Sequence, residues 1–203
     1  PTVIVQDAFA NTETTAFADW LLPAAGWGEK DGTVTNSERR ISRLRAAVPP
    51  LGDARADWRI AADVAQRLEV RLGRTATPGG AGSAFAYADA EAVWNEHRAT
   101  TVGRDLDIGG LSWALLDRDG PQSWPMPEGA AAGRTRLYED HRFATDDGRA
   151  RFIAAPHVAP AEAPDARHPF TLTTGRLRDQ WHGMTRTGTV PPLFAHAPQP
   201  VLH

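Results

Sequence analysis

The sequence contains no cysteine among its 203 residues. Disulfide bonds, cysteinyl zinc sites, cysteine-ligated iron–sulfur clusters and thiolate catalysis are therefore excluded for these residues acting alone. No window approaches about 18 consecutive apolar residues, which excludes a transmembrane helix. The seven histidines show no H-x-x-x-H or H-E-x-x-H spacing, so we assign no metal-ligating residue.

Other familiar catalytic and cofactor-binding patterns are also missing. There is no G-x-G-x-x-G fingerprint for nicotinamide dinucleotides and no G-x-S-x-G nucleophile elbow. The 22 Lys plus Arg residues are outnumbered by 25 Asp plus Glu, which gives a formal net charge of -3. This balance argues against general nucleic-acid binding, because tracking a phosphate backbone needs a basic face. We therefore expect neither a nucleic-acid partner nor a membrane partner.

The composition is that of a folded protein. With 41% hydrophobic residues, the chain is long enough to form one large domain or two small ones around a real core. It begins at Pro1 instead of an initiator Met and ends at His203 just after an apolar segment. We therefore expect a fragment of a longer protein, in which no signal peptide can be judged from these residues.

The start of the chain predicts an α/β unit. Residues 2–5 form an apolar, β-branched run that is typical of a buried parallel strand and that ends at Gln6 and Asp7. A helix is predicted to begin at residue 11 or 12 and to extend to residue 20. The next apolar run, residues 20–25, contains a proline and predicts a second strand near a sheet edge.

Farther along, apolar residues at helical spacing predict two amphipathic helices. The first covers residues 58–72, with Asp57 as its N-cap or first-turn acid, and the second covers residues 84–98. Residues 74–83 are rich in Thr, Pro and Gly and predict a linker. Residues 117–133 lack periodicity and predict an extended excursion over a surface. Short strands are predicted at residues 136–142, 151–154 and 170–173.

The segment 173–188 gathers hydroxyls, three arginines, a histidine and glycines after the last predicted strand. Gly175 would let backbone amides approach a ligand, and Arg176 could fork onto a phosphate. Trp181 and His182 could stack on a heterocycle or hydrogen-bond to it. The alternative is a polar loop whose arginines pair with neighbouring carboxylates, since charge runs are usually solvated. The segment predicts a site for a large anionic ligand.

Two further groups of polar residues lie in the first forty positions. Gln6 and Asp7 follow a predicted parallel strand, and ligands of open parallel sheets bind at the carboxyl ends of the strands. Asp7 could accept hydrogen bonds from a nucleobase edge or a ribose, or it could instead cap a helix or a turn. Lys30, in segment 27–40, could meet a phosphate or a base carbonyl. The alternative for this segment is a hairpin with solvated charges.

The order and spacing of several motifs resemble those of the molybdopterin oxidoreductases. In the first part of the chain these motifs are Q-D-A-F at 6–9, T-T-A-F-A-D at 14–19, L-P-A-A at 22–25, Trp27, E-K-D-G-T at 29–33, N-S-E-R-R at 36–40 and D-W at 57–58. Thr174, Gly175 and Arg176, with Trp181 and His182, resemble the start of the C-terminal dinucleotide-binding domain of that family. The middle of the chain resembles the assimilatory nitrate reductase branch of this family. The motifs that carry this resemblance are N-E-H-R at 95–98, G-R-D-L-D-I at 103–108, G-P at 120–121, W-P at 124–125 and R-L-Y at 136–138.

The resemblance implies an α/β fold in which a partial Rossmann-like dinucleotide-binding domain is followed by the start of a C-terminal β-barrel of the double-psi type. Residues 1–73 would be the end of the α/β domain. Residues 74–155 would be a linker, a helix and an extended connecting region, and residues 156–203 would begin the barrel domain. The molybdenum ligand and the cysteines of a 4Fe-4S cluster are expected upstream of Pro1. We therefore assign no catalytic residue in this chain.

The implied cofactor is molybdenum bound by two molybdopterin guanine dinucleotides. Carried over to the matching positions, Gln6 and Asp7 would contact one guanosine, and Lys30 and Asp57 would contact the same dinucleotide. The residues that would line the second dinucleotide are Thr174, Gly175, Arg176, Trp181, His182, Gly183, Thr185 and Arg186. These are binding roles, because the cofactor carries the redox chemistry.

The resemblance implies that the complete protein is a molybdenum-dependent oxidoreductase, namely a cytoplasmic nitrate reductase of the assimilatory type that reduces nitrate to nitrite. This chain alone is expected to be inactive. The expected electron donor is ferredoxin, flavodoxin or an NADH-dependent reductase subunit. Within the family, the alternatives are a periplasmic nitrate reductase and a formate dehydrogenase. The alternative from another class is a non-catalytic homologue that has lost the pterin, as in the large peripheral subunit of respiratory complex I.

Overall fold

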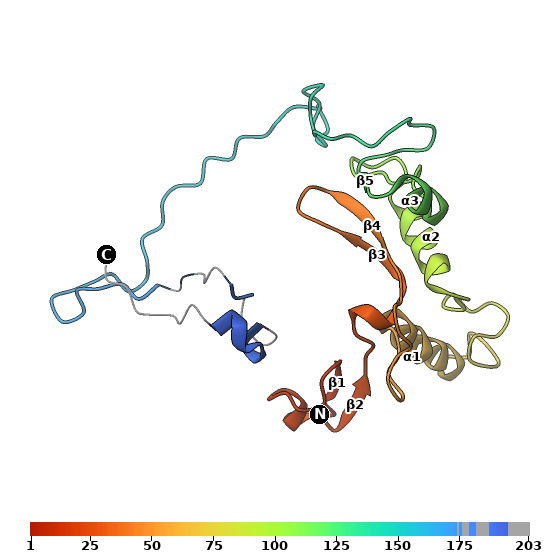
Figure 1. Cartoon of the computed structure of the whole chain (residues 1–203). Helices are drawn as coiled ribbons and strands as arrows, with labels where there is room; N and C mark the ends of the chain where they lie inside the picture. Colours follow the sequence, from red (N-terminus) through yellow and green to blue (C-terminus); the bar gives the residue numbers. More distant parts are fainter. Residues whose placement is uncertain (174, 176–178, 182–186, 195–203) are drawn as a thin grey trace. The chain divides into compact units, whose positions relative to one another are not determined.

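The computed structural model describes residues 1–173, 175, 179–181 and 187–194. The chain divides into two compact units, Pro1–Arg151 and Phe152–His203. The first unit contains two small sheets and three α-helices (Figure 1). In the described part of the second unit, the regular structure consists of two 3₁₀ helices, Thr187–Thr189 and Pro191–Phe194.

The N-terminal sheet is a parallel pair of strands. β1 (Ile4–Asp7) pairs with β2 (Trp20–Pro23), and Ile4 lies opposite Trp20. Both predicted strands are confirmed, although β1 begins and ends two residues later than the apolar run suggested. Asp7 is the last residue of β1, so the predicted polar pair does lie at the carboxyl end of a parallel strand.

The predicted helix over residues 11–20 is wrong. A single 3₁₀ turn, η1 (Thr15–Phe17), lies there, and Trp20 belongs to β2. Threonine hydroxyls replace helical bonds, because the Thr15 amide donates to Thr12 Oγ1 at 3.3 Å and Thr15 Oγ1 donates to the Thr12 carbonyl at 2.8 Å. The β-branched side chains also disfavour a helix. The two parallel strands are therefore joined without an α-helix.

The second sheet contains an antiparallel hairpin. β3 (Gly32–Thr35) pairs with β4 (Arg40–Leu44), and β5 (Gln122–Ser123) pairs with the other side of β4. The strand order is β3-β4-β5. The expectation that segment 27–40 contributes to a hairpin is confirmed.

The turn of this hairpin is tied to a distant part of the chain. Asn36 Oδ1 accepts a hydrogen bond from the Arg40 amide at 3.0 Å. Arg39 has a φ of 60°, and its guanidinium donates to the carbonyl of Trp124 and, at 2.8 Å, to that of Thr135. A left-handed φ is unusual for arginine. These bonds to main-chain carbonyls show that the Arg39 charge is not simply solvated.

Three α-helices complete the first unit: α1 (Asp57–Arg71), α2 (Ala90–Thr100) and α3 (Trp113–Asp119). The first predicted helix is confirmed within one residue at each end, and its first residue is the predicted acid. The second begins later than predicted because the side chain of Asp89 caps it by accepting the Ala92 amide at 2.8 Å.

The predicted core face of α1 is partly wrong. Ile60 is buried, but Val64 and Leu68, which recur with it at helical spacing, are exposed. Glu69 is buried instead, and its carboxylate accepts hydrogen bonds from the Ser83 hydroxyl and from the Ala84 amide. A buried carboxylate needs such partners, and the loop after α1 supplies them.

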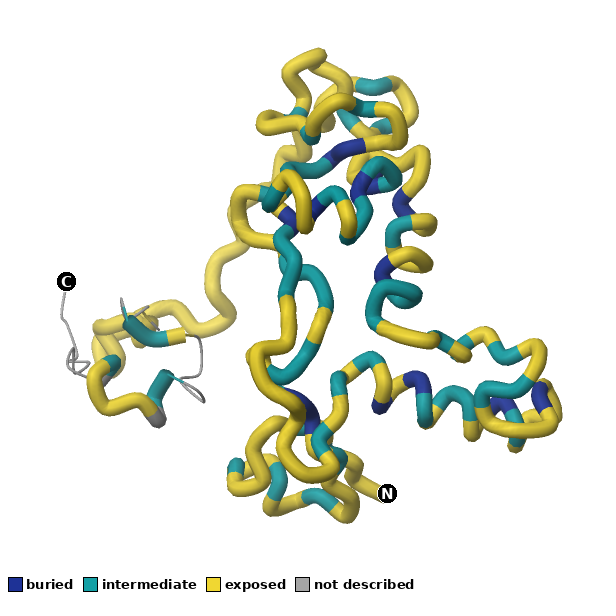
Figure 2. Tube along the Cα trace, turned by 45° about the vertical axis from the view of Figure 1, so that its right-hand side comes forward, coloured by how far each residue is buried: buried dark blue, intermediate teal, exposed yellow. Residues whose placement is uncertain are grey.

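The core lies where α2 and α3 contact the hairpin. Figure 2 shows that buried residues are few and that much of the chain is exposed. The buried cluster consists of Ile41, Trp94, Ile108, Leu111, Leu116 and Met126. Met126 lies within residues 117–133, so the predicted surface excursion is wrong at this point. Its amide donates to the Asp107 carbonyl at 2.7 Å, and its carbonyl accepts the Gly110 amide at 2.8 Å.

The short strands predicted at residues 136–142, 151–154 and 170–173 are wrong, because none of these described segments is a strand. In the first, Tyr138 and His141 have φ values of 59° and 54°, which no strand accommodates. In the other two segments the apolar side chains Phe152, Ile153 and Leu172 are exposed, so burial does not stabilise a strand there. The described helices are all too short or too polar to cross a membrane.

Candidate functional site

Three of the predicted cofactor-contacting residues meet at the end of β1. Gln6 Nε2 donates to Asp57 Oδ1 at 2.8 Å, although the two residues are 51 positions apart. Lys30 Nζ donates to Asp57 Oδ2 at 2.6 Å across 27 positions. The three side chains come from β1, from the residue after the 3₁₀ turn η2 (Trp27–Glu29), and from the first turn of α1. We call them the Gln6–Lys30–Asp57 cluster.

A capped turn positions Lys30. The Gly26 amide donates to Glu29 Oε2 at 2.7 Å, and this bond caps the N-terminal end of η2. The carbonyl of Gly28 accepts the amides of Ala47 and Val48 at 2.8 and 3.1 Å, which ties η2 to the end of the hairpin. Lys30 therefore follows a turn whose backbone is held by hydrogen bonds within the turn and by hydrogen bonds to residues 47 and 48.

Backbone bonds to the segment after β2 position Asp57. Ala24 forms a parallel bridge with Arg55, in which the Arg55 amide donates to the Pro23 carbonyl at 3.1 Å and the Ala25 amide donates to the Arg55 carbonyl at 2.8 Å. The segment before α1 thus extends the parallel pairing of β2. As a result, α1 begins beside the carboxyl end of β1, where Gln6 lies.

The cluster keeps the Asp57 carboxyl ionised at neutral pH. Partial burial raises its pKa, but the hydrogen bonds from Lys30 and Gln6 and the positive charge of Lys30 lower it, and the result is a pKa below the ordinary value of 3.8. Each carboxylate oxygen has spare lone pairs beyond these two bonds. Asp57 can therefore accept further hydrogen bonds from a ligand.

Asp7 lies at the same strand end but makes a local bond. Its Oδ1 accepts the Phe9 amide at 3.0 Å, which is the turn role that its position also allowed. Among the described contacts it has no bond to the cluster, although it directly follows Gln6. The structure thus brings together three of the four predicted residues of the first unit and places the fourth beside them.

Of the predicted residues in segment 173–188, the structure describes Gly175 and Trp181. Gly175 is exposed. The Trp181 side chain is exposed, and its amide donates to Thr187 Oγ1 at 3.1 Å. The predicted contacts of Thr174, Arg176, His182, Gly183, Thr185 and Arg186 lie outside the described residues.

A polar cleft of about 670 Å³ adjoins Lys30. Its other wall is formed by the start of α1, including Trp58 and Arg59. No side chain caps the N-terminus of α1, whose N-cap position is Ala56. Arg59 makes a weak hydrogen bond of 3.4 Å to the Tyr87 carbonyl. The same cleft is also lined by Glu29, Asp31, Asp63 and Asp89, so its charge is mixed, and Lys30 and Arg59 are the groups that would bind an anion.

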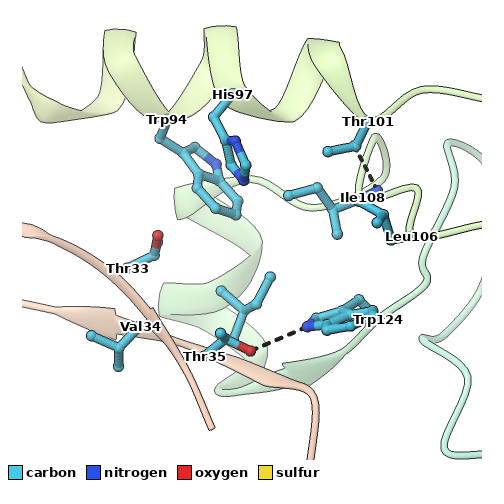
Figure 3. A pocket seen from close by; sticks show the side chains of 10 residues that line it. Thr33, Val34, Thr35, Trp94, His97, Thr101, Leu106, Ile108 and Trp124 are labelled. Atoms are coloured by element: carbon cyan, nitrogen blue, oxygen red, sulfur yellow. Dashed lines mark hydrogen bonds between the residues drawn. The ribbon is translucent and has the colours of Figure 1, made fainter. Parts of the chain in front are cut away.

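A second cavity of about 420 Å³ lies between β3 and α2. Figure 3 shows Trp94 and His97 of α2 above Thr33, Val34 and Thr35 of β3. Its walls are mainly apolar, and none of the residues predicted to bind a cofactor lines it. Sequence reasoning gave no signal for this cavity, because it depends on how the hairpin packs against α2. Across the described residues, no three His, Asp or Glu side chains form a group that could hold a metal ion.

Comparison with known proteins identifies the family of the chain. The sequence model described as molybdopterin oxidoreductase matches residues 1–67, which contain all three cluster residues. A nitrate reductase of Klebsiella oxytoca is 43% identical over the whole chain. The chain belongs to the molybdopterin oxidoreductase family. The family resemblance of the sequence motifs is thereby confirmed.

Two further relatives are nearly as similar. A nitrate reductase of Synechocystis is 40% identical over 97% of the chain, and the alpha subunit of an F420-dependent formate dehydrogenase of Methanocaldococcus jannaschii is 39% identical over 91%. The chain spans only 22% of the Klebsiella protein, 27% of the Synechocystis protein and 25% of the Methanocaldococcus protein. The shared segment is thus about a quarter of each relative.

The first unit of this molybdopterin oxidoreductase chain combines an ionised carboxylate with nearby cationic side chains. Asp57 can accept further hydrogen bonds from N–H donors. Lys30 and Arg59 line the adjoining cleft and can bind a negatively charged group.

Proposed function

We propose that this chain is the part of a molybdenum-dependent nitrate reductase that binds the guanine dinucleotide form of the pterin cofactor. The observation that carries the proposal is the cluster itself, in which Gln6, Lys30 and Asp57 meet from three distant segments. Nitrate is the proposed substrate because relatives that align over the whole chain or nearly all of it are nitrate reductases. The bound cofactor would supply the electron transfer at molybdenum.

The roles of this chain's own residues are to bind and to orient. Asp57 would accept the donors of the guanine edge, and Lys30 would hold the carboxylate in place and meet a base carbonyl or a phosphate. Gln6 would fix the second carboxylate oxygen through its 2.8 Å bond. Asp7 would contribute through its free oxygen at the same strand end.

The finer features of the proposal come from the family resemblance. In the second unit, the segment from Thr174 to Arg186 would line a second dinucleotide, and residues 156–203 would begin a double-psi β-barrel. Residues 1–73 would close a Rossmann-like domain. A 4Fe-4S cluster, a cytoplasmic location, and ferredoxin, flavodoxin or an NADH-dependent subunit as the electron donor complete the proposal.

Formate oxidation is the second candidate function. It is favoured by the formate dehydrogenase of Methanocaldococcus jannaschii, which is 39% identical to the chain, against 40% for the Synechocystis nitrate reductase. Residues that contact a cofactor shared by two enzymes do not distinguish their substrates. Substrate choice therefore has to be measured.

The experiment is to purify the whole protein, determine molybdenum by elemental analysis and GMP after acid hydrolysis, and assay nitrate reduction and formate oxidation. We expect molybdenum, GMP and nitrate reduction. Asp57→Ala should lower the molybdenum and GMP content, whereas Asp53→Ala, outside the cluster, should not. Formate oxidation without nitrate reduction would select the second candidate. Absence of molybdenum from the wild-type protein would overturn both and favour a homologue without the pterin.

A further inference from the structure

An exposed indole stands next to the Gln6–Lys30–Asp57 cluster. Trp27 is 57% exposed, and the ammonium of Lys30 lies 5.6 Å from the centroid of its ring. Burying a large aromatic side chain is favourable, and much of this indole stays accessible although Lys30 lies over it. Trp27 therefore has surface to offer to a ligand that reaches Lys30.

The backbone around Trp27 is fixed. It is the first residue of η2, which is closed by the 2.7 Å bond between the Gly26 amide and Glu29. The next residue, Gly28, is held through its carbonyl by the amides of residues 47 and 48. An aromatic side chain on a fixed backbone is suited to stacking with little loss of entropy.

A nucleobase has two features that proteins bind separately, a flat face and a polar edge. Aromatic side chains stack on the face, and they do so with every base. Carboxylates and amides read the edge. At this site Trp27 can supply the stacking surface, while Asp57 and Gln6 supply the groups for the edge.

We infer that Trp27 is the residue on which the guanine base of the dinucleotide stacks. This inference rests on the proposed function, because it adds a binding residue to the same site. It also assigns different roles in nucleotide binding to Trp27 and Asp57. Trp27 sets the affinity for a base of either kind, whereas Asp57 sets the preference for guanine over adenine.

The test uses the whole protein prepared without cofactor and titrated with GDP and with ADP by calorimetry. Trp27→Leu should weaken the binding of GDP and of ADP by a similar factor, about tenfold. Trp27→Phe should retain most of the affinity because it keeps an aromatic face. Asp57→Asn should instead reduce the preference for GDP. Trp20→Leu is the matched control, since Trp20 is 66% exposed and lies on β2 outside the cluster.

The outcomes separate the two proposals. If the wild-type protein as purified releases no GMP on hydrolysis, the proposed function itself fails. If GMP is present and Trp27→Leu binds both nucleotides as tightly as Trp20→Leu does, the stacking role alone is overturned. Urea unfolding of each cofactor-free variant supplies the remaining check. If the Trp27→Leu protein is unfolded under the titration conditions, the Trp27→Phe protein decides. The stacking role is also overturned if the Trp27→Phe protein binds GDP and ADP no better than the Trp27→Leu protein.

Discussion

The ammonium of Lys30 lies 2.6 Å from Oδ2 of Asp57 and joins the end of η2 to the first residue of α1. Lys30 is the only lysine in the chain, so this is the only lysine ion pair that the sequence can form. The two side chains are 23% and 53% exposed, and solvent therefore screens the attraction. The pair organises the cluster more than it stabilises the fold.

The first prediction concerns the strength of this pair. Lys30→Gln and Asp57→Asn should each lower the free energy of unfolding at pH 7 only slightly, and the double variant should show a coupling of about 0.5 to 1 kcal/mol, as expected for a partly exposed pair. Urea unfolding measures it. The exposed pair of Arg118 and Asp119 is the control, and Arg118→Gln should cost even less. A coupling of several kcal/mol would show that the pair is desolvated.

The second prediction is a pH dependence. The pKa of Asp57 is lower in the folded state than its ordinary value of 3.8, so the unfolded state binds its proton first as the pH falls. The stabilisation is therefore complete above about pH 4 to 5 and is lost as the pH falls through the folded-state pKa. The stability difference between wild type and Asp57→Asn should be constant near neutrality and should vanish in acid. A difference that grew as the pH fell would contradict this sign.

The parts of this site that sequence could predict were those encoded locally. The β-branched run before Gln6 predicts a strand that ends near Asp7, and the acid before an amphipathic pattern predicts the start of α1 at Asp57. Family resemblance then predicted that these residues share a ligand. Local patterns could not predict the 2.8 Å bond between Gln6 and Asp57, because it depends on the bridge between Ala24 and Arg55.

The failed predictions have a common physical origin. The threonines around Thr15 formed hydroxyl bonds that no apolar periodicity reports. Met126 sits in a Pro- and Gly-rich stretch that looked like surface, but main-chain bonds to Asp107 and Gly110 draw it into the core. In both places, specific hydrogen bonds overrode the average preference of the residues.

A third prediction concerns the wall of the 420 Å³ cavity. The indole Nε1 of Trp124 donates to Thr35 Oγ1 at 3.1 Å. Thr35→Val keeps the shape and removes the acceptor, and it should lower the free energy of unfolding by about 1 kcal/mol. Thr33→Val on the same strand is the control, because the structure records no such bond for its hydroxyl among the described residues. Chemical denaturation of the two variants distinguishes them, and equal losses would mean that the bond contributes little.

A fourth prediction concerns a close approach of two backbone segments. A Cβ on Gly133 would clash with the carbonyl oxygen of Ser123 in β5. Because the obstacle is backbone, Gly133→Ala must displace one of the two segments, and it should cost about 1 to 3 kcal/mol or more. Gly32→Ala is the matched control, since no atom of the described residues lies within 4 Å of its Cβ position. Unfolding measurements that gave both variants the same stability would show that the segments separate easily.

A fifth prediction concerns the loop that follows α1. Glu69 accepts hydrogen bonds from the Ser83 hydroxyl and, at 3.0 Å, from the Ala84 amide, and these bonds lower the pKa of the Glu69 carboxyl. Ser83→Ala removes one bond, while Glu69→Gln weakens both by removing the negative charge that assists them. We expect faster tryptic cleavage after Arg74 in both variants, and the larger effect in Glu69→Gln.

The half-buried residue Glu91 provides the control for this loop, because Glu91→Gln removes an equal charge from α2 and should leave cleavage after Arg74 unchanged. The sign of the pH effect follows from the lowered pKa. Glu69 holds the loop above its ordinary pKa of 4.5 and releases it as the pH falls through the folded-state value. An acid-active protease should therefore cut wild type more slowly than Glu69→Gln at pH values above the folded-state pKa of Glu69. Well below that pKa, the two proteins should be cut at the same rate. If the two proteins were cut at the same rate across the whole range, these hydrogen bonds would not be what holds the loop against α1.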